Sequence, residues 1–338
     1  MSPSTDRGGP GPIVGIVGAG VTGQSVGRVL HSLGGRVAWY DLAAEAAVRA
    51  GRRHGGVAVD SLDDLRVVDA VVLASPGPQF EIAASLIDDG VDVVSLSDDR
   101  SDVVELLTLQ RRAVTSQARL VVGAAMSPGL TGLLARHLVS ELATADEVHV
   151  AMYGTGGPAC ARHHHDALGG RAWGWHDGEW VERPGGSGRE LCWFPDPIGP
   201  ADCYRASLAD PLLLHRAFPQ ASRVSARVSA TRRDRLTARL PMLAPPHADG
   251  DRGAIRVEVR GSLADGARET LVVGAVGRTG DLAGTVAAMF ALECIAGTIP
   301  LGVAVSGEDA SLSRRLLGSL SSAGVHVHEF TGVARAAV

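Results

Sequence analysis

Three glycines near the N-terminus have a spacing that can bind phosphate groups. Gly18, Gly20 and Gly23 form the pattern G-x-G-x-x-G, which follows a short apolar run and precedes an apolar-periodic segment. The first glycine of this pattern allows a tight turn, the second lets the backbone approach a pyrophosphate, and the third lets helix and strand pack closely. The N-terminus of the following helix offers free N–H groups to an anion. The residues expected to bind a dinucleotide are Gly18, Ala19, Gly20, Val21, Thr22 and Gly23.

An acidic residue, Asp41, directly follows the next apolar run, residues 36–40. A carboxylate about 20 residues after such glycines accepts hydrogen bonds from the ribose hydroxyls of adenosine. It also repels a 2′-phosphate, so Asp41 favours NAD over NADP. Because strand, glycines, helix, strand and acid occur in this order, the segment is typical of a Rossmann dinucleotide site and not of a glycine-rich loop.

A run in the middle of the chain, residues 154–166, contains the consecutive histidines His163, His164 and His165. Adjacent helical positions point about 100° apart and no E-x-x-H partner is visible, so no metal site is expected. A histidine can transfer protons near neutral pH, which makes His164 and His165 candidate proton donors. Arg162 is a candidate substrate ligand. The alternative is that these are surface residues or buried histidines with structural hydrogen bonds.

A second candidate cluster includes Tyr204 and Arg205. An arginine binds a carboxylate through two parallel hydrogen bonds, which suits an amino-acid-like substrate. Tyr204 is a further candidate proton donor. Equally, Arg205 could form a structural salt bridge with Asp196 or Asp202.

The candidate residues must be positioned by strands and helices. In the first 127 residues, the sequence predicts strands that alternate with helices. Apolar strands are expected at 67–74, 91–96 and 119–124, with helices between them. This alternation predicts a parallel, doubly wound sheet, in which ligands lie outside the carboxyl ends of the strands. The segment that follows the strand at 67–74 should therefore border the nicotinamide half of the cofactor, as should Ser95 to Asp98. Its expected cofactor-binding residues are Ser75, Pro76 and Gly77.

The strand at 119–124 leads into a further helix start. Ser127 suits an N-cap and Pro128 the first helical position, so Ser127, Pro128 and Gly129 are expected to hold a substrate carboxylate at a helix N-terminus. The alternative is that these residues only begin the helix.

The second half of the chain has the pattern of β-hairpins. Asp177-Gly178 and Asp265-Gly266 each lie between strand-like segments, which predicts a mostly antiparallel sheet with a few helices. An apolar helix at 281–296 is expected to pack back on the first domain. The predicted organisation is a disordered leader (1–12), a Rossmann domain (13–127) and an α+β domain (128–338) for substrate binding and oligomerisation. The fold class is α/β.

Composition narrows the function classes. The 338 residues are 45% hydrophobic and 20% charged, with a formal net charge of -5. We expect no nucleic-acid partner and no membrane span. Four cysteines without C-x-x-C spacing fit a reducing cytoplasm. The chain has no lysine, which excludes Schiff-base lysine chemistry and the Tyr-x-x-x-Lys chemistry of short-chain dehydrogenases.

Two motifs together resemble the saccharopine dehydrogenase-like oxidoreductases. They are the glycine pattern at 18–23 and the run Met126-Ser127-Pro128-Gly129-Leu130; the segment 255–261, followed by a hairpin and a long alanine-rich helix, is also similar. The resemblance implies an NAD(P)-dependent enzyme that acts on the C–N bond of an amino-acid-derived carboxylate, reducing an imine to a secondary amine or the reverse. It also implies a homodimer or larger homo-oligomer formed through the sheet of the second domain. Several members of this family prefer NADP, whereas Asp41 favours NAD.

Other functions are compatible with the same motifs. One is an enzyme that keeps tightly bound NAD as a recycled cofactor, such as a cyclodeaminase or epimerase. Another is a non-catalytic protein that senses dinucleotides. A methyltransferase that uses S-adenosylmethionine fits less well, because Gly23 and Gly27 suit the close helix packing of a dinucleotide site.

Overall fold

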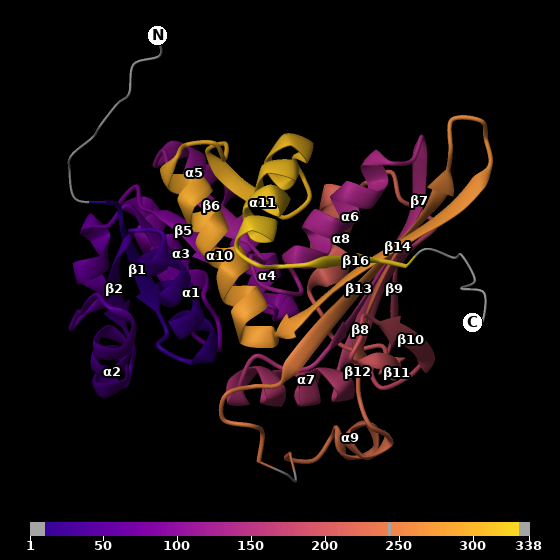
Figure 1. Ribbon diagram of the computed structural model, residues 1–338, viewed down its shortest axis with the longest axis horizontal. Coiled ribbons are helices and arrows are strands. Elements are labelled where there is room, and N and C mark those ends of the chain that lie inside the picture. Colours follow the sequence, from indigo (N-terminus) through magenta and orange to yellow (C-terminus); the bar gives the residue numbers. More distant parts are fainter. Residues whose placement is uncertain (1–10, 243–244, 331–338) are drawn as a thin grey trace, which may run out of the picture.

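The computed structural model describes residues 11–242 and 245–330. Two β-sheets lie on either side of a layer of helices (Figure 1). Helices α8 (Asp210–Ala217) and α10 (Thr279–Ile295) contact strands of both sheets. Of the expected leader 1–12, residues 1–10 lie outside the described residues.

The first sheet has seven strands, and all their pairings are parallel. Its order, β15-β6-β5-β4-β1-β2-β3, contains the doubly wound order 3-2-1-4-5-6 of dinucleotide-binding sheets. The strands are β1 (Ile13–Val17), β2 (Arg36–Tyr40), β3 (Val57–Ala58), β4 (Ala70–Leu73), β5 (Asp92–Ser95), β6 (Arg119–Val122) and β15 (Gly302–Val305). The predicted parallel Rossmann sheet is therefore confirmed.

Helices flank this sheet, as the alternation of elements requires. They are α1 (Val21–Ser32), α2 (Ala44–His54), α3 (Phe80–Asp88), α4 (Arg100–Leu107) and α5 (Gln110–Thr115), with a short 3₁₀ helix at Leu62–Val67. Between β5 and β6 the chain forms two short helices, α4 and α5, and not one continuous helix. At the break the Thr108 hydroxyl donates a hydrogen bond to the Glu105 carbonyl (2.6 Å), which competes with the regular helical pattern.

The end of the described chain returns to the first sheet. Helix α10 is apolar on nearly all sides and packs against α1, where a Cβ added to Gly284 would lie 2.5 Å from the Ser25 Cβ. Strand β15 then pairs with β6, and α11 (Ala310–Ser322) follows. The predicted boundary at residue 127 assigned residues 302–305 to the second domain, whereas strand β15 belongs to the first sheet.

The second sheet has nine strands and carries the hairpins predicted at Asp177-Gly178 and Asp265-Gly266. Only the pairing of β7 with β12 is parallel, so the expected mostly antiparallel sheet is confirmed. The strands are β7 (Thr144–Tyr153), β8 (Arg171–His176), β9 (Glu179–Pro184), β10 (Glu190–Phe194), β11 (Gly199–Tyr204), β12 (Arg223–Ser229), β13 (Arg252–Ser262), β14 (Arg268–Arg278) and β16 (Val327–Glu329). The remaining helices are α6 (Leu130–Ser140), α7 (Pro158–Gly169) and α9 (Arg232–Thr237).

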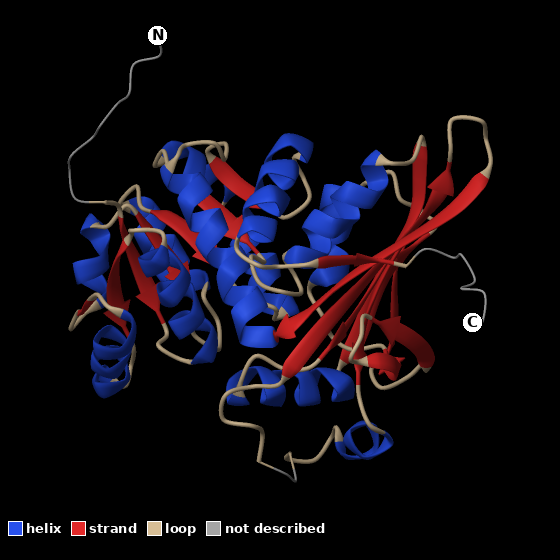
Figure 2. Cartoon of the chain, viewed as in Figure 1, coloured by secondary structure: helices blue, strands red, loops and turns tan. Residues whose placement is uncertain are grey.

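Helices cover one face of the second sheet (Figure 2), and the side chains of the sheet differ between that face and the other. On β7, Val148, Val150 and Met152 are buried in the core, while Glu147 and His149 alternate with them on the opposite face. This period of two is what a half-buried strand requires. None of the helices in the described residues is long and apolar enough to cross a membrane.

Candidate active site

The glycine loop connects β1 to α1 in a conformation that only glycine permits at two positions. Gly18 has a φ of +102°, and a Cβ there would lie 2.6 Å from the Ser75 backbone nitrogen. A Cβ on Gly23 would lie 1.8 Å from the Gly18 carbonyl oxygen. By contrast, a Cβ on Gly20 would have no atom within 4 Å. The space beside Gly20 therefore lies open at the N-terminus of α1, where a pyrophosphate would approach.

Asp41 at the end of β2 is hydrogen-bonded directly to this loop. Its Oδ2 accepts from the Ala19 backbone N–H (2.7 Å), and its Oδ1 accepts from the Ala43 N–H (2.8 Å). The Ala19 carbonyl in turn accepts a hydrogen bond from Gln24 Nε2 (2.9 Å). The loop and the acid are thus held together before any ligand binds. The sequence motif includes Asp41 but gives no sign of Gln24.

The segments after β4 and β5 are joined by a buried amide, Gln79. Its Nε2 donates to the Ser75 carbonyl (2.9 Å), and its Oε1 accepts from the Ser95 hydroxyl (2.8 Å). The Ser95 oxygen also accepts from the Ser97 N–H (3.2 Å). Ser75, Pro76 and Gly77 follow β4 at the carboxyl edge of the sheet, as expected from the topology, and Ser75 lies beside Gly18. Nothing in the local sequence indicates this role of Gln79.

The second domain contributes a further glycine-containing loop, residues 154–157. A Cβ on Gly156 would lie 3.3 Å from the Thr22 Oγ1, and one on Gly157 would lie 3.1 Å from the Val21 Cγ2. This loop therefore lies against the first turn of α1. Helix α7 begins directly after it, with Pro158 in its first turn.

Three side chains converge where α7 meets the segment after β5. The Cys160 Sγ lies 3.7 Å from the His164 Nε2, which lies 3.4 Å from the Asp98 Oδ2. Burial opposes the charge on His164, but Cys160 and Asp98 outweigh it and hold the pKa of His164 well above its ordinary value. Burial alone would raise the pKa of Asp98, yet His164 and His163 bring it below its ordinary value. The sequence predicted His164 and the position of Asp98, but assigned no role to Cys160.

A cavity of about 960 Å³ lies beside this group, with His164 in its wall. It is bounded by the ends of β7 and β12, by α7 and by α9. Three arginines also line it, Arg232, Arg233 and Arg252, together with Asp202, Asp234 and Asp251. The cavity thus combines three cationic groups, which can bind an anionic ligand, with three acidic groups.

The other predicted proton donors have structural surroundings. The His165 imidazole bonds through Nε2 to the Leu240 carbonyl (2.9 Å). Tyr204 is 2% exposed and lies in the hydrophobic core, with the Arg235 guanidinium 5.5 Å from the centre of its ring. Neither is brought into the group formed by Cys160, His164 and Asp98.

The two predicted substrate-binding arginines are likewise separated. Arg162 is exposed on α7. Arg205 lines a different cavity, of about 420 Å³, on the polar face of the second sheet. Burial lowers the pKa of Arg205, as do the nearby Arg227 and Arg183.

The expectation for Ser127 and Pro128 requires correction. Helix α6 begins at Leu130, after Gly129 with a φ of +136°, so Ser127 is not its N-cap. A tight turn precedes the helix instead: the Ala125 N–H donates to the Pro128 carbonyl (2.8 Å), and the Leu130 N–H donates to the Ala125 carbonyl (2.9 Å). A Cβ on Gly129 would lie 2.0 Å from that Ala125 oxygen, so the turn needs glycine.

Ser127 bonds to a buried carboxyl group instead of capping the helix. Its hydroxyl donates to the Asp210 Oδ1 (2.8 Å), as does the Thr131 hydroxyl (2.9 Å). Asp210 is completely buried, and its Oδ2 has no hydrogen-bond partner among the described residues. Burial raises the pKa of Asp210 to about 6, although the two hydroxyls oppose this, and the charge of Asp98 adds to it.

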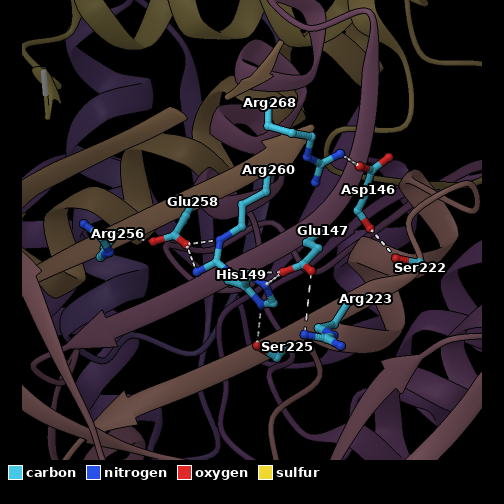
Figure 3. A network of polar contacts seen from close by, with 10 residues as sticks. All are labelled: Asp146, Glu147, His149, Ser222, Arg223, Ser225, Arg256, Glu258, Arg260 and Arg268. Carbon is cyan, nitrogen blue, oxygen red and sulfur yellow. Dashed lines mark hydrogen bonds and ion pairs between the residues drawn. The ribbon is translucent and has the colours of Figure 1, made fainter. Parts of the chain in front are cut away.

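The polar face of the second sheet carries a separate network of charges (Figure 3). Glu147 accepts from His149 (2.9 Å) and pairs with Arg260 (3.2 Å), while His149 bonds the Ser225 hydroxyl (2.8 Å). Glu258 pairs with Arg260 (2.6 Å) and with Arg256. The acidic and basic groups on this face are thus paired with each other. These contacts lie within one chain and do not test the predicted homo-oligomerisation through this sheet, which stays a prediction.

Neither a protein-family model nor a curated protein sequence matches this chain. Its structure is similar to apo saccharopine dehydrogenase (L-Glu forming) from Saccharomyces cerevisiae, with a TM-score of 0.73 at 15% identity over 95% of this chain and 100% of that chain. It is also similar to GenD2 from gentamicin A biosynthesis, solved in complex with NAD, with a TM-score of 0.50 at 15% identity over 98% and 100%. A meso-dapdh mutant from Clostridium tetani, solved with DAP, has a TM-score of 0.50 at 10% identity over 89% and 95%. These similarities confirm the saccharopine dehydrogenase-like fold that the motifs indicated.

Proposed function

We propose that this protein is an NAD-dependent oxidoreductase that transfers a hydride between nicotinamide and a small substrate. The observation that carries this proposal is the glycine loop. Gly20 leaves open space at the N-terminus of α1, and Asp41 is hydrogen-bonded to the same loop. A pyrophosphate beside Gly20 would accept hydrogen bonds from the backbone N–H groups in the first turn of α1. The adenosine ribose would then lie near Asp41.

The preference for NAD over NADP rests on the fixed position of Asp41. Hydrogen bonds from Ala19 and Ala43 hold the two carboxylate oxygens. Each oxygen keeps a free lone pair for a ribose hydroxyl. A 2′-phosphate would meet a negative charge that cannot turn away without losing both bonds.

We propose further that the substrate is an amino-acid-derived carboxylate and that the reaction forms or breaks its C–N bond. An imine would be reduced to a secondary amine, or the reverse. Two observations support this choice: the fold shared with saccharopine dehydrogenase, and the arginines that line the cavity beside His164. Arginine binds carboxylates well because its planar group donates two parallel hydrogen bonds. His164 and His165 both line the cavity, but the His165 imidazole is bonded to the Leu240 carbonyl, so His164 is the predicted proton donor that this geometry favours.

Titration with reduced cofactors tests the proposal directly. The purified protein is titrated with NADH and with NADPH, and binding is followed by quenching of tryptophan fluorescence. Tighter binding of NADH supports the proposal and justifies a screen of amino acids paired with 2-oxo acids or aldehydes. If NADPH binds more tightly, the role of Asp41 is wrong. If neither cofactor binds, the protein is not a dehydrogenase.

A further inference from the structure

The group formed by Asp98, Cys160 and His164 brings together one oxygen, one sulfur and one nitrogen atom. All three ligand atoms lie within 4.8 Å of one another. Cys160 and His164 are four residues apart on α7, so their side chains share one face of that helix. Asp98 comes from the segment after β5, on the first domain. We propose that this group binds a divalent transition metal, with Zn²⁺ as the best fit.

The distances match a tetrahedral site. Zn²⁺ binds sulfur at about 2.3 Å and nitrogen or carboxylate oxygen at about 2.0 Å, which places the ligand atoms of a tetrahedron about 3.3–3.6 Å apart. The observed separations are 3.7 Å from the Cys160 Sγ to the His164 Nε2 and 3.4 Å from that nitrogen to the Asp98 Oδ2. A charge-assisted hydrogen bond between an imidazole and a carboxylate is shorter, at about 2.7–2.9 Å. The observed distances are therefore closer to those between two ligands of one ion than to the length of a direct hydrogen bond between imidazole and carboxylate.

The chemistry of the donors selects the metal. A thiolate together with an imidazole suits Zn²⁺, whereas Mg²⁺ and Ca²⁺ prefer sites made of oxygen alone. The Cys160 Sγ lies 3.7 Å from the His164 Nε2 and 4.0 Å from its Nδ1, and the Asp98 Oδ2 lies 3.4 Å from Nε2, so Nε2 is the ring nitrogen placed to share an ion with both groups.

The surroundings leave a position open for a further ligand. His164 is buried, but Cys160 is only partly buried and the Asp98 side chain is 29% exposed. Three protein ligands with one free position are typical of catalytic zinc sites. The His163 Nε2 also lies near this carboxylate, 3.5 Å from the Asp98 Oδ1.

The location gives the ion a role that rests on the proposed function. Asp98 follows β5 at the carboxyl edge of the first sheet, where the nicotinamide half of a bound dinucleotide is expected. An ion there polarises the substrate atom next to the carbon that exchanges hydride. His164 would then hold the ion, and metal-bound water would take over the proton transfer that we proposed for His164.

Metal binding can be measured without any substrate. The full-length protein is stripped with a chelator and then titrated with Zn²⁺ against a chromophoric competitor, and with Co²⁺ in the visible spectrum. We expect one ion per chain, together with a thiolate-to-cobalt charge-transfer band. Cys160→Ser should abolish that band, and His164→Ala or Asp98→Asn should weaken Zn²⁺ binding by more than about 100-fold. His176→Ala, which changes a half-exposed histidine on β8, is the matched control and should bind as the wild type does.

Circular dichroism of each variant shows whether it folds, and NADH titration of the same samples separates the two proposals. A folded wild-type protein that binds no ion stoichiometrically overturns the metal site, as does Zn²⁺ affinity that is unchanged in both Cys160→Ser and His164→Ala. If NADH still binds in that case, the proposed oxidoreductase function stands. If Zn²⁺ binds but NADH does not, the metal site stands and its role in hydride transfer fails.

Discussion

The carboxylate of Asp41 accepts a hydrogen bond from the backbone N–H of Ala19, at 2.7 Å. This contact joins the end of β2 to the middle of the glycine loop, 22 residues earlier in the chain. The acid that would select the ribose therefore also fixes the loop that would bind the pyrophosphate. A substitution at this position should change both the shape of the loop and the choice of cofactor, and the two effects can be separated.

Asp41→Asn should shift the preference from NADH toward NADPH. The amide oxygen can still accept the Ala19 N–H and hold the glycine loop, while the amide NH2 replaces the acceptor for the Ala43 N–H and the negative charge is gone. Removing a repulsion of about 1.4 kcal/mol changes the ratio of the two affinities about tenfold. The measurement is the ratio of dissociation constants for NADH and NADPH in the variant and the wild type. An unchanged ratio would show that Asp41 does not face the 2′ position.

Gly20→Val should abolish dinucleotide binding without unfolding the protein. Gly20 has an extended backbone (φ -74°, ψ -169°) that any residue can adopt, and no atom lies within 4 Å of its added Cβ. The new side chain would fill the space proposed for the pyrophosphate. Gly318→Val on α11 is the matched control, because its Cβ also meets no atom within 4 Å. Both variants should melt near the wild-type temperature, and only Gly20→Val should lose NADH. Normal NADH affinity in Gly20→Val would place the cofactor elsewhere.

Asp210→Asn should remove a pH-dependent loss of stability. The pKa of Asp210 is raised by burial to about 6, well above the ordinary value of an aspartate. Between about pH 4 and about pH 6 the folded state therefore binds more protons than the unfolded state, so stability falls as the pH rises. The full penalty, about 3 kcal/mol, is present above about pH 6.

The asparagine does not titrate, so the comparison isolates this one group. The free energy of unfolding of the variant minus that of the wild type should increase from about pH 4 to about pH 7. Urea denaturation at a series of pH values measures it. A difference that stays constant over this range would mean that Asp210 is ionised at an ordinary pKa.

The sequence predicts the first sheet and its glycine loop because these signals are local. Each strand of that sheet is a short apolar run, and Gly18, Gly20 and Gly23 lie within six residues, from the end of β1 into the first turn of α1. Strand β15 was not predicted, because Gly302–Val305 is only four residues long and pairs with β6, more than 180 residues earlier. Hydrophobic periodicity gives no signal in so short a segment.

The candidate site depends more on contacts that are distant in the sequence. The three consecutive histidines predicted side chains that diverge, but only His165 does: it bonds the Leu240 carbonyl, whereas His163 and His164 both lie beside Asp98. The four-residue spacing of Cys160 and His164 is a local pattern that places the two side chains on one face of a helix. Asp98 could not be added from the sequence, because only the packing of the two domains brings it beside α7. The same holds for Asp210, which meets Ser127 only in the folded chain.

The buried amide of Gln79 should couple the segments that follow β4 and β5. Gln79→Leu leaves the Ser75 carbonyl and the Ser95 hydroxyl without their partner, and a buried polar group without a partner costs about 1–3 kcal/mol. Ser95→Ala removes only one of these two bonds. In a double-mutant cycle of the two changes, we expect a coupling energy of about 1 kcal/mol, because both variants lose the same hydrogen bond.

The cycle is measured twice, once by urea denaturation and once by NADH titration. Both segments are expected to border the nicotinamide half of the cofactor, so Gln79→Leu should weaken NADH binding as well as lower stability. Ser140→Ala is the control, since it removes an exposed hydroxyl on α6 that bonds only the His137 carbonyl. A cycle that couples in stability but leaves NADH affinity unchanged would show that Gln79 holds the sheet edge without positioning the cofactor.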